Sequence, residues 1–567
     1  MRIIDQMQFA GEDVRTRKFL LPVSVVSTSG CVRSADELLV RKSMQIGLNE
    51  PSCAVLENKD DGENASILLD FGRELHGGIR LMAFKIQGTD NPLMQITFGE
   101  SVGEAESRLG EKGAVNAHSA RQFTVPVPEY SDQEWGQTGF RFVRLELLSK
   151  NTIVMLKSAM AVFVFRDYPY LGSFDSSDPV LNLIYDTAAY TCHLNLQNMV
   201  WDGIKRDRLV WIGDMMTECL TIRDVFGAIP LVEESLEFVK DQTPLPGWMN
   251  DLPSYSLWWL MIVREWYLTS GSESFLQAQK EYVLVLLDQI CGLVSKDGTD
   301  RLPSYFFDWP THGTQAEKSG VRCLLRMALE SGAELAEYYK DEERTRRCRE
   351  CRRSLDKQTE YADGEKQILA FMGLTGVMEL SEAALRITEN GTSGFSTFLL
   401  YYLLRAVAEG DSTETALSLL KEYLLGMLEK GATTFWEDFD SSWAEHSGCV
   451  TDTPSRERPD IHGDFGMFCY KGYRHSLCHG WASGAVAFLT EYVLGVRILS
   501  PGCRRLLIRP QLCGLEHVSG SFPTPYGVVE ISHRLNPAGE ILSRIKAPDG
   551  VEIVCKNCKR ISEDETQ

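Results

Sequence analysis

The chain has 567 residues, of which 44% are hydrophobic and 10% aromatic, and its 79 Asp and Glu outnumber 58 Lys and Arg, which gives a formal net charge of −21. At roughly 150 residues per domain this length predicts about three or four domains, and the composition excludes disorder for most of the chain. The excess negative charge repels phosphate backbones and anionic lipid head groups, so we expect neither nucleic acid nor membrane among the partners.

We expect neither export nor membrane insertion from this sequence. No apolar run reaches the roughly 18 to 20 residues that span a bilayer, since the longest candidate, Leu257 to Leu268, contains charged residues. The first residues carry acids and have no apolar core of a secretory signal. Fifteen scattered cysteines, an odd number, fit reduced thiols. We therefore expect a cytoplasmic protein, and a homo-oligomer is one alternative that the sequence leaves open.

Short runs that alternate apolar and polar residues extend from about residue 66 to 166, among them SILLDF, LMQITFGE and FRFVRLELL. In the last run Phe140, Phe142, Leu145 and Leu147 lie close to a period of two, which places them on one face of a half-buried strand. Several such strands separated by Gly, Pro and Asp predict an antiparallel β-sandwich within residues 1–172.

The pattern changes to helical at Ser177-Asp178-Pro179, where an acidic N-cap and a proline at the first helical position predict a helix start. Apolar residues then recur at steps of three and four, as they do between Val283 and Val294. Long aromatic loops separate the helices. We expect an (α/α)6 toroid over residues 173–495, with its loops gathered at one end.

Short strand patterns return after Gly495. The segment VRILSPGCRRLLIRPQL contains two of them, and FPTPYGVVEISHRL has the pattern of a hairpin. These runs predict a small C-terminal β-domain over residues 496–560, followed by a tail at 561–567.

The densest cluster of polar and aromatic side chains runs from Trp201 to Asp214. It holds three carboxylates, three cations and two tryptophans, namely Asp202, Asp207, Asp214, Lys205, Arg206, Arg208, Trp201 and Trp211. An indole covers the apolar face of a pyranose while charged groups fix its hydroxyls, so the mixture indicates a sugar site. The alternative is an ion-paired entry to a helix.

A second cluster, from Gly431 to Asp440, places Glu437 beside Trp436. Hydrolysis of a glycosidic bond needs one carboxyl to protonate the leaving oxygen and another to act from the opposite face, and their separation decides the stereochemical outcome. Only the fold could bring Glu437 to Asp207. By itself Glu437 could equally be an ordinary surface acid.

These residues resemble the α-L-rhamnosidases of glycoside hydrolase family 78. RDRLVWIGD, TTFWE and CHGWASG occur in the order of that family's motifs. Upstream, LLDFGRELHGG, ITFGES and GFRFVRLEL are similar to its β-sandwich, and the segment from GCRRLLIRPQL to FPTPYG is similar to its C-terminal sandwich. The resemblance covers the chain from about residue 70 to near its end.

The resemblance implies a role for each matching residue. Asp207 would be the general acid, and Glu437 the general base that activates water. The other residues that match the family's motifs would bind the sugar; they are Asp202, Asp214, Trp211 and His479. Arg206 and Trp436, which precede Asp207 and Glu437 in the sequence, would bind it as well. It further implies that the reaction inverts configuration and needs no metal; we expect no cofactor.

This sequence departs from the family at the acid position. Asp207 stands where the family has Glu, and the stretch between Asp202 and Asp207 is one residue shorter. Glu218, four residues after Asp214 and on the same helical face, is an alternative acid, a sugar ligand or a partner of Arg223.

Two further tryptophans, Trp258 and Trp309, could line the pocket as the hydrophobic wall that a 6-deoxy sugar favours, or belong to the toroid core. We expect a glycoside hydrolase that removes terminal L-rhamnose or a similar deoxy sugar from a carbohydrate substrate. Helical toroids also host unsaturated-uronide hydrolases and sugar phosphorylases, and a non-catalytic sugar-binding protein is a further alternative.

Overall fold

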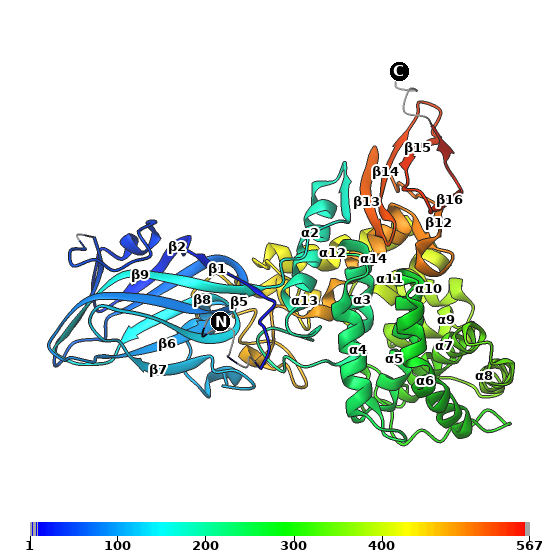
Figure 1. Cartoon of the computed structure of the whole chain (residues 1–567), viewed down its shortest axis with the longest axis horizontal. Coiled ribbons are helices and arrows are strands. Elements are labelled where there is room, and N and C mark those ends of the chain that lie inside the picture. The colour runs from blue at the N-terminus through cyan, green and yellow to red at the C-terminus, as the bar shows by residue number, and fades with distance from the viewer. Residues whose placement is uncertain (1–2, 4–6, 8–9, 51, 562–567) are drawn as a thin grey trace.

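The computed structural model describes residues 3, 7, 10–50 and 52–561. An N-terminal sheet domain lies at one end of the molecule, a helical domain at the other, and a small C-terminal sheet domain rests on the helices (Figure 1). Within the described part of the chain, no helix combines the length and apolar character that crossing a bilayer requires.

The N-terminal domain is one hydrogen-bonded sheet in which long, bent strands form the centre. Its main path runs β3-β4-β9-β5-β8-β6-β7, and β1 and β2 pair with β9 and β5. The strands are β1 (Thr16–Leu20), β2 (Ser24–Ser29), β3 (Cys31–Arg33), β4 (Ala54–Asn58), β5 (Ser66–Gln87), β6 (Leu93–Gly99), β7 (Gln122–Pro126), β8 (Ser131–Leu147) and β9 (Thr152–Phe165), with the short helix α1 (Val102–Glu106) after β6.

The core of this domain follows from the alternation along strand β8. Phe140, Leu145 and Leu147 are fully buried in one apolar cluster, as the sequence predicted. The prediction is wrong for Phe142, which is buried in a separate cluster with Leu68 of β5 and the apolar residues of α1. Each such side chain contributes roughly 1.5–3 kcal/mol through burial.

The helical domain is a toroid of two concentric rings. The inner ring closes on itself, because each helix packs on the next and the last packs on the first. Its members are α3 (Ile212–Val225), α5 (Pro253–Ser270), α7 (Glu317–Tyr338), α9 (Lys366–Leu374), α11 (Leu400–Gly410) and α14 (Ala485–Phe488), which continues into a π-turn at Leu489–Val493. The outer ring contains α2 (Pro179–Asn195), α4 (Pro230–Gln242), α6 (Glu273–Leu293), α8 (Glu342–Leu355), α10 (Leu380–Thr388) and α12 (Thr413–Glu429).

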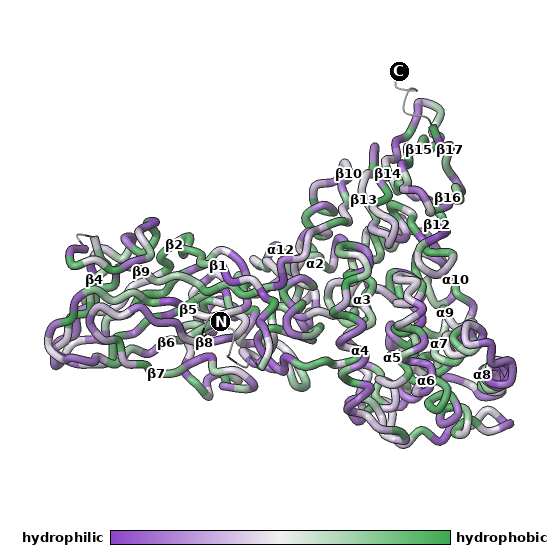
Figure 2. The backbone as a smooth tube through the Cα atoms, viewed as in Figure 1, coloured by the Kyte–Doolittle hydropathy of each residue, from purple (hydrophilic) through white to green (hydrophobic). Residues whose placement is uncertain are grey.

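The helices of the inner and outer rings differ in hydropathy and burial. Every residue of α3 is buried, as expected for a helix surrounded by others. The outer helix α8 is strongly hydrophilic and buries few residues (Figure 2). The start of α2 confirms the predicted cap, since the Asp178 carboxylate accepts from Val180 N at 2.9 Å and Pro179 takes the first helical position.

The C-terminal domain consists of two small sheets whose apolar faces join the core of the toroid. One sheet has the order β10-β13-β14-β15-β17 and the other β11-β12-β16. The strands are β10 (Ser173–Ser176), β11 (Val496–Ile498), β12 (Arg505–Ile508), β13 (His517–Thr524), β14 (Gly527–Leu535), β15 (Ile541–Lys546), β16 (Glu552–Cys555) and β17 (Lys559–Arg560). The predicted hairpin is formed by β13 and β14.

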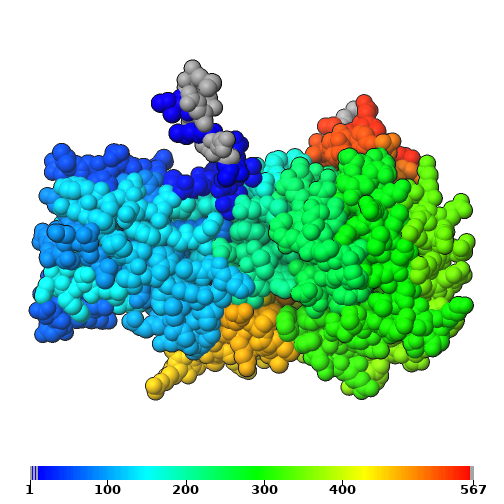
Figure 3. All heavy atoms as spheres, turned by 60° about the horizontal axis from the view of Figure 1, so that its bottom comes forward, coloured from blue at the N-terminus to red at the C-terminus, as the bar shows by residue number. Residues whose placement is uncertain are grey.

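A long segment without strands connects α12 to α14 and includes the short helix α13 (Ser441–His446). In the space-filling view its later part, coloured orange, lies between the N-terminal sheet domain and the helices (Figure 3). It therefore sits where the two domains meet.

Candidate active site

The loop before α3 is a tight, strained turn. Asp202 closes it, because Leu209 N donates to the Asp202 carboxylate at 2.9 Å and Asp202 N donates to Leu209 O at 3.1 Å. At its tip Asp207 and Arg208 both adopt positive φ, at 55° and 57°. Such values are uncommon outside glycine and cluster at functional sites, where surrounding contacts must hold them.

Two segments far from this loop in the sequence meet beside it. Glu437 N donates to Ser476 O at 2.9 Å, and His479 N donates to Phe435 O at 3.1 Å. Gly480 N in turn donates to Asp202 O at 2.7 Å. Backbone hydrogen bonds thus fix the TTFWE and CHGWASG segments beside the loop that carries Asp202 and Asp207.

One imidazole nitrogen lies among three of the predicted carboxylates. His479 Nε2 is 3.8 Å from Asp202, 3.9 Å from Asp214 and 3.7 Å from Glu437. All four side chains are nearly fully buried. Asp202, Asp214 and His479 also present ligand atoms within 4.8 Å of one another, an arrangement that could hold a cation.

Arg206 links the two predicted catalytic acids. Its Nη2 pairs with Glu437, and its Nη1 lies 3.4 Å from Asp207. The carboxyl groups of Asp207 and Glu437 are therefore separated by little more than one guanidinium with its contacts. Ser476 N donates to the second oxygen of Glu437 at 3.0 Å, so both oxygens of this carboxylate have partners.

Burial shifts the pKa values of the side chains around His479. It raises the pKa of Asp202 and Asp214 well above the usual range, and neighbouring carboxylates raise both further. It lowers the pKa of His479 well below its usual value, so the ring is neutral near pH 7. Burial would also lower the pKa of Arg206, but the Glu437 and Asp207 carboxylates outweigh it and raise the pKa.

Glu218 lies on α3 behind these residues. Its Oε1 is buried without a hydrogen-bond partner among the described residues, and burial followed by the charges of Asp214 and Asp202 raises its pKa well above the usual value. A Cβ at Gly480 would come within 1.5 Å of this oxygen, so the glycine lets the two segments approach. Glu218 does not pair with Arg223, which instead bonds Asp224, Glu265 and Glu491.

Aromatic rings surround the acids. Trp211 forms the N-cap of α3 and meets Tyr255 edge to face at 5.9 Å, and the Tyr255 hydroxyl donates to Asp214 at 3.1 Å. Trp481 lies 4.1 Å from the ring of His479 and donates to Glu437 O at 3.0 Å.

The other predicted tryptophans pack among aromatic side chains. Trp258 is buried in the toroid core against a ring of aromatic side chains, Phe371, Phe398 and Tyr402. Trp436 is buried beside His475. Trp309 is half-buried and packs against Phe306 of its own loop and against Phe468 of the segment between α13 and α14.

Sequence reasoning missed several residues that touch the acids. Trp481 lies in the CHGWASG segment, and Tyr255 lies in the first turn of α5, directly after an aromatic loop, so the clustering of aromatic residues could have found both. His118 belongs to the N-terminal domain, and its Nδ1 lies 2.8 Å from the Asp207 carboxylate. No motif marks His118 or the backbone of Ser476.

A separate cavity of about 410 Å³ lies toward the C-terminal ends of α3 and α5. It is lined by charged side chains that already pair with one another, such as Arg223 with Glu491 and Arg264 with Glu334. None of the predicted catalytic acids lines it, so it is distinct from the candidate active site.

Two family models match the chain. Residues 169–370 match the bacterial alpha-L-rhamnosidase 6 hairpin glycosidase domain, and residues 495–556 match the bacterial alpha-L-rhamnosidase C-terminal domain. The toroid therefore has the fold of a six-hairpin glycosidase domain. More particularly, its residues 169–370 and the C-terminal residues 495–556 are similar to the glycosidase and C-terminal domains of bacterial α-L-rhamnosidases.

Solved structures share this fold at low sequence identity. A GH78 family rhamnosidase of Bacillus sp. GL1 has a TM-score of 0.71 and 20% identity over 93% of this chain and 56% of its own. A rhamnosidase from Klebsiella oxytoca with rhamnose bound has a TM-score of 0.64 and 18% identity over 84% of this chain and 96% of its own. A Streptomyces avermitilis alpha-L-rhamnosidase complexed with L-rhamnose has a TM-score of 0.66 and 15% identity over 86% of this chain and 48% of its own.

This chain thus spans little more than half the length of the Bacillus protein but nearly all of the Klebsiella protein. A comparison with curated proteins gave no match.

Proposed function

We propose that this protein is an inverting glycoside hydrolase that releases a terminal α-L-rhamnose, or a closely similar deoxy sugar, from a glycoside. The observation that carries the proposal is the bridge formed by Arg206 between Asp207 and Glu437, beside the buried group of Asp202, Asp214 and His479. The match to the rhamnosidase domains supports the choice of sugar.

Glu437 serves as the general base in this mechanism. Its carboxylate is oriented by Ser476 N and Arg206, which leaves it placed to take a proton from water. Asp207 donates a proton to the leaving oxygen. Asp202 and Asp214, whose pKa values are raised, can donate as well as accept hydrogen bonds to sugar hydroxyls.

A second candidate function is sugar binding without hydrolysis. The Asp207 carboxyl already contacts Arg206 at 3.4 Å and His118 at 2.8 Å, and these partners compete with a leaving oxygen for it. Glu218 is the alternative acid under the hydrolytic function, because burial favours its protonated form.

The decisive experiment follows aryl α-L-rhamnosides by NMR and records the first anomer released. Inverting hydrolysis gives β-L-rhamnose first and does not depend on phosphate. Release of the α-anomer would contradict inversion, phosphate dependence would indicate a phosphorylase, and calorimetric binding of L-rhamnose without turnover would support the binding function.

Two variants then test the roles. Glu437→Gln should lower kcat about 10²–10⁴-fold, since general base catalysis contributes that much, while L-rhamnose still binds. Asp207→Asn should lose most activity on substrates with poor leaving groups and less on activated ones. The exposed Glu429→Gln, at the end of α12, is a matched control with unchanged turnover. Full activity of Asp207→Asn on a poor leaving group would remove Asp207 from the acid role.

A further inference from the structure

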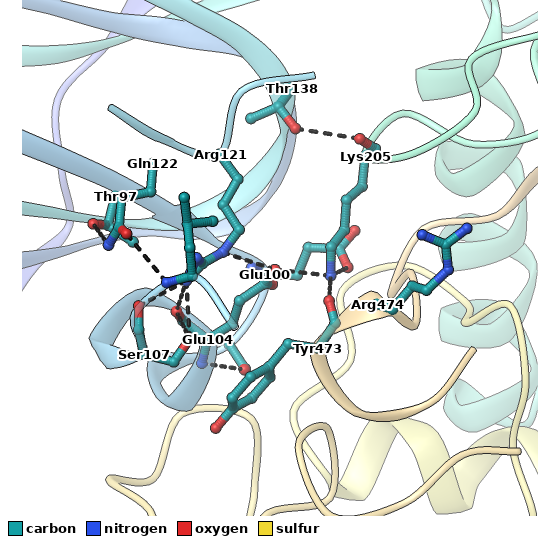
Figure 4. Close-up of polar contacts among 12 residues, drawn as sticks. Thr97, Glu100, Glu104, Ser107, Arg121, Gln122, Thr138, Lys205, Tyr473 and Arg474 are labelled. Atoms are coloured by element: carbon teal, nitrogen blue, oxygen red, sulfur yellow. Dashed lines mark hydrogen bonds and ion pairs between the residues drawn. The ribbon is translucent and has the colours of Figure 1, made fainter. Parts of the chain in front are cut away.

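A buried cluster of charged side chains joins the N-terminal sheet domain to the helical domain. Glu100 and Glu104 follow strand β6, and Lys205 reaches them from the loop that carries Asp207 (Figure 4). Glu100 is 2% exposed, Glu104 1% and Lys205 8%. Charges buried to this degree are tolerated only when they are paired and hydrogen-bonded.

The Lys205 ammonium is held from four sides. Its Nζ lies 3.1 Å from Glu100 and 3.0 Å from Glu104, and it donates to the carbonyl oxygens of Tyr473 at 2.7 Å and His475 at 2.8 Å. The two glutamates come from the sheet domain, whereas the two carbonyls come from the segment between α13 and α14. The lysine therefore ties three parts of the chain together.

Glu100 also holds the segment that orients Glu437. Its carboxylate accepts from Leu477 N at 2.7 Å and from Ser476 Oγ at 3.2 Å. The backbone N of the same Ser476 donates to Glu437 Oε2 at 3.0 Å. Ser476 thus contacts both Glu100 of the sheet domain and Glu437, the carboxylate proposed as the base.

The sheet domain also holds the residue before Arg206. Ser119 Oγ donates to Lys205 O at 2.9 Å, so both ends of Lys205 are fixed by side chains of the sheet domain. Arg206, the next residue, pairs with Glu437. Both contacts that orient the Glu437 carboxylate, Ser476 N and Arg206, are therefore anchored to the same domain.

We propose that Glu100 is a positioning residue for catalysis: it fixes Ser476 so that the Ser476 N–H holds Glu437 in the orientation that activates water. This inference rests on the proposed hydrolytic function. Displacements near 1 Å can lower a rate about a hundredfold, so the buried ion cluster sets the rate without touching the sugar.

Replacing Glu100 tests this role in the full-length protein. Glu100→Gln keeps the size of the side chain but loses the charge that pairs with Lys205. We expect kcat for an aryl α-L-rhamnoside to fall about 10–100-fold, with KM and the Kd of L-rhamnose changed by less than about threefold. The fall should be the same for good and poor leaving groups, because the proposed path from Glu100 runs through Ser476 to the base.

A double-mutant cycle distinguishes positioning from general damage. If Glu100 acts through Glu437, adding Glu100→Gln to Glu437→Gln should lower the residual kcat by no more than about twofold. Ser476→Ala, which introduces no charge change, should lower kcat in the same direction. It supplies the test if Glu100→Gln does not fold. Glu57→Gln, in strand β4 and paired with Arg33, is the control and should leave kcat unchanged.

Three results would overturn the positioning role. They are an unchanged kcat in Glu100→Gln, a fall that adds fully to that of Glu437→Gln, and a loss that appears in KM and in L-rhamnose binding instead of kcat. Absence of hydrolysis by the wild-type protein counts against the proposed function itself and is established first.

Discussion

At the scale of single residues, the loop tip shows how a strained backbone is held in place. Asp207 and Arg208 both have positive φ, and each such non-glycine residue costs of order 1–3 kcal/mol. Arg208 offsets this cost with hydrogen bonds to the carbonyl oxygens of Gln137, at 2.9 Å, and His118. Both acceptors belong to the sheet domain, so the conformation of the candidate acid depends on a neighbouring domain.

Asp308 gives a prediction about pH. It is 1% exposed, and burial raises its pKa to about 7. The unfolded chain releases the Asp308 proton near pH 4, whereas the folded protein keeps it until about pH 7. The stability due to this proton is therefore fully present below pH 4 and is lost as the pH rises to 7. Relative to Asp308→Asn, the wild type should lose on the order of 4 kcal/mol of unfolding free energy over this range.

Urea unfolding at several pH values measures this difference. The exposed Asp61→Asn is the control, and its stability profile should follow that of the wild type. Parallel stability profiles of the wild type and Asp308→Asn would show that Asp308 titrates normally.

At the scale of elements, the first outer helix offers a test of its cap. Asp178 accepts from Val180 N and also pairs with Lys421 on α12. Asp178→Ala should lower the free energy of unfolding by about 1 kcal/mol, mainly through the lost cap. Asp178→Ser keeps a capping oxygen but not the ion pair, so a loss as large as that of alanine would assign the effect to Lys421. The midpoint of urea unfolding measures both.

Local patterns predicted the elements that local residues determine. The start of α2 at Pro179 and the hairpin of β13 and β14 were predicted from caps, turns and alternation. The placing of Asp207 and Glu437 at one site was implied by the family resemblance and not by any local pattern. Strand β10 was not predicted, because its partner β13 lies far along the chain. His118 and Ser476 were missed for the same reason, since tertiary contacts alone give them a place at the site.

At the scale of the whole molecule, the sheet domain and the toroid share a bonded interface. Arg141 of β8 donates to Gly431 O at 3.1 Å, and Tyr190 of α2 donates to Glu74 O at 2.6 Å. The Glu100–Lys205 cluster lies in the same interface. Separating the domains would leave these buried groups unpaired, which is costly.

We therefore expect the two domains to unfold together. Scanning calorimetry of the full chain should show one cooperative transition, and Arg141→Ala should shift it to lower temperature as a single peak. Two well-separated transitions in the wild type would show that the interface does not couple the domains.

The pairing of β10 with β13 also bears on synthesis at the ribosome. The hydroxyls of Ser173 and Ser521, 348 positions apart, lie 2.8 Å from each other across these strands. At about 5–20 residues per second, the first strand waits tens of seconds for its partner to be translated. During that interval the backbone N–H and C=O groups of β10 that later bond β13 are unpaired. Such an open strand edge can pair with another chain unless a chaperone covers it.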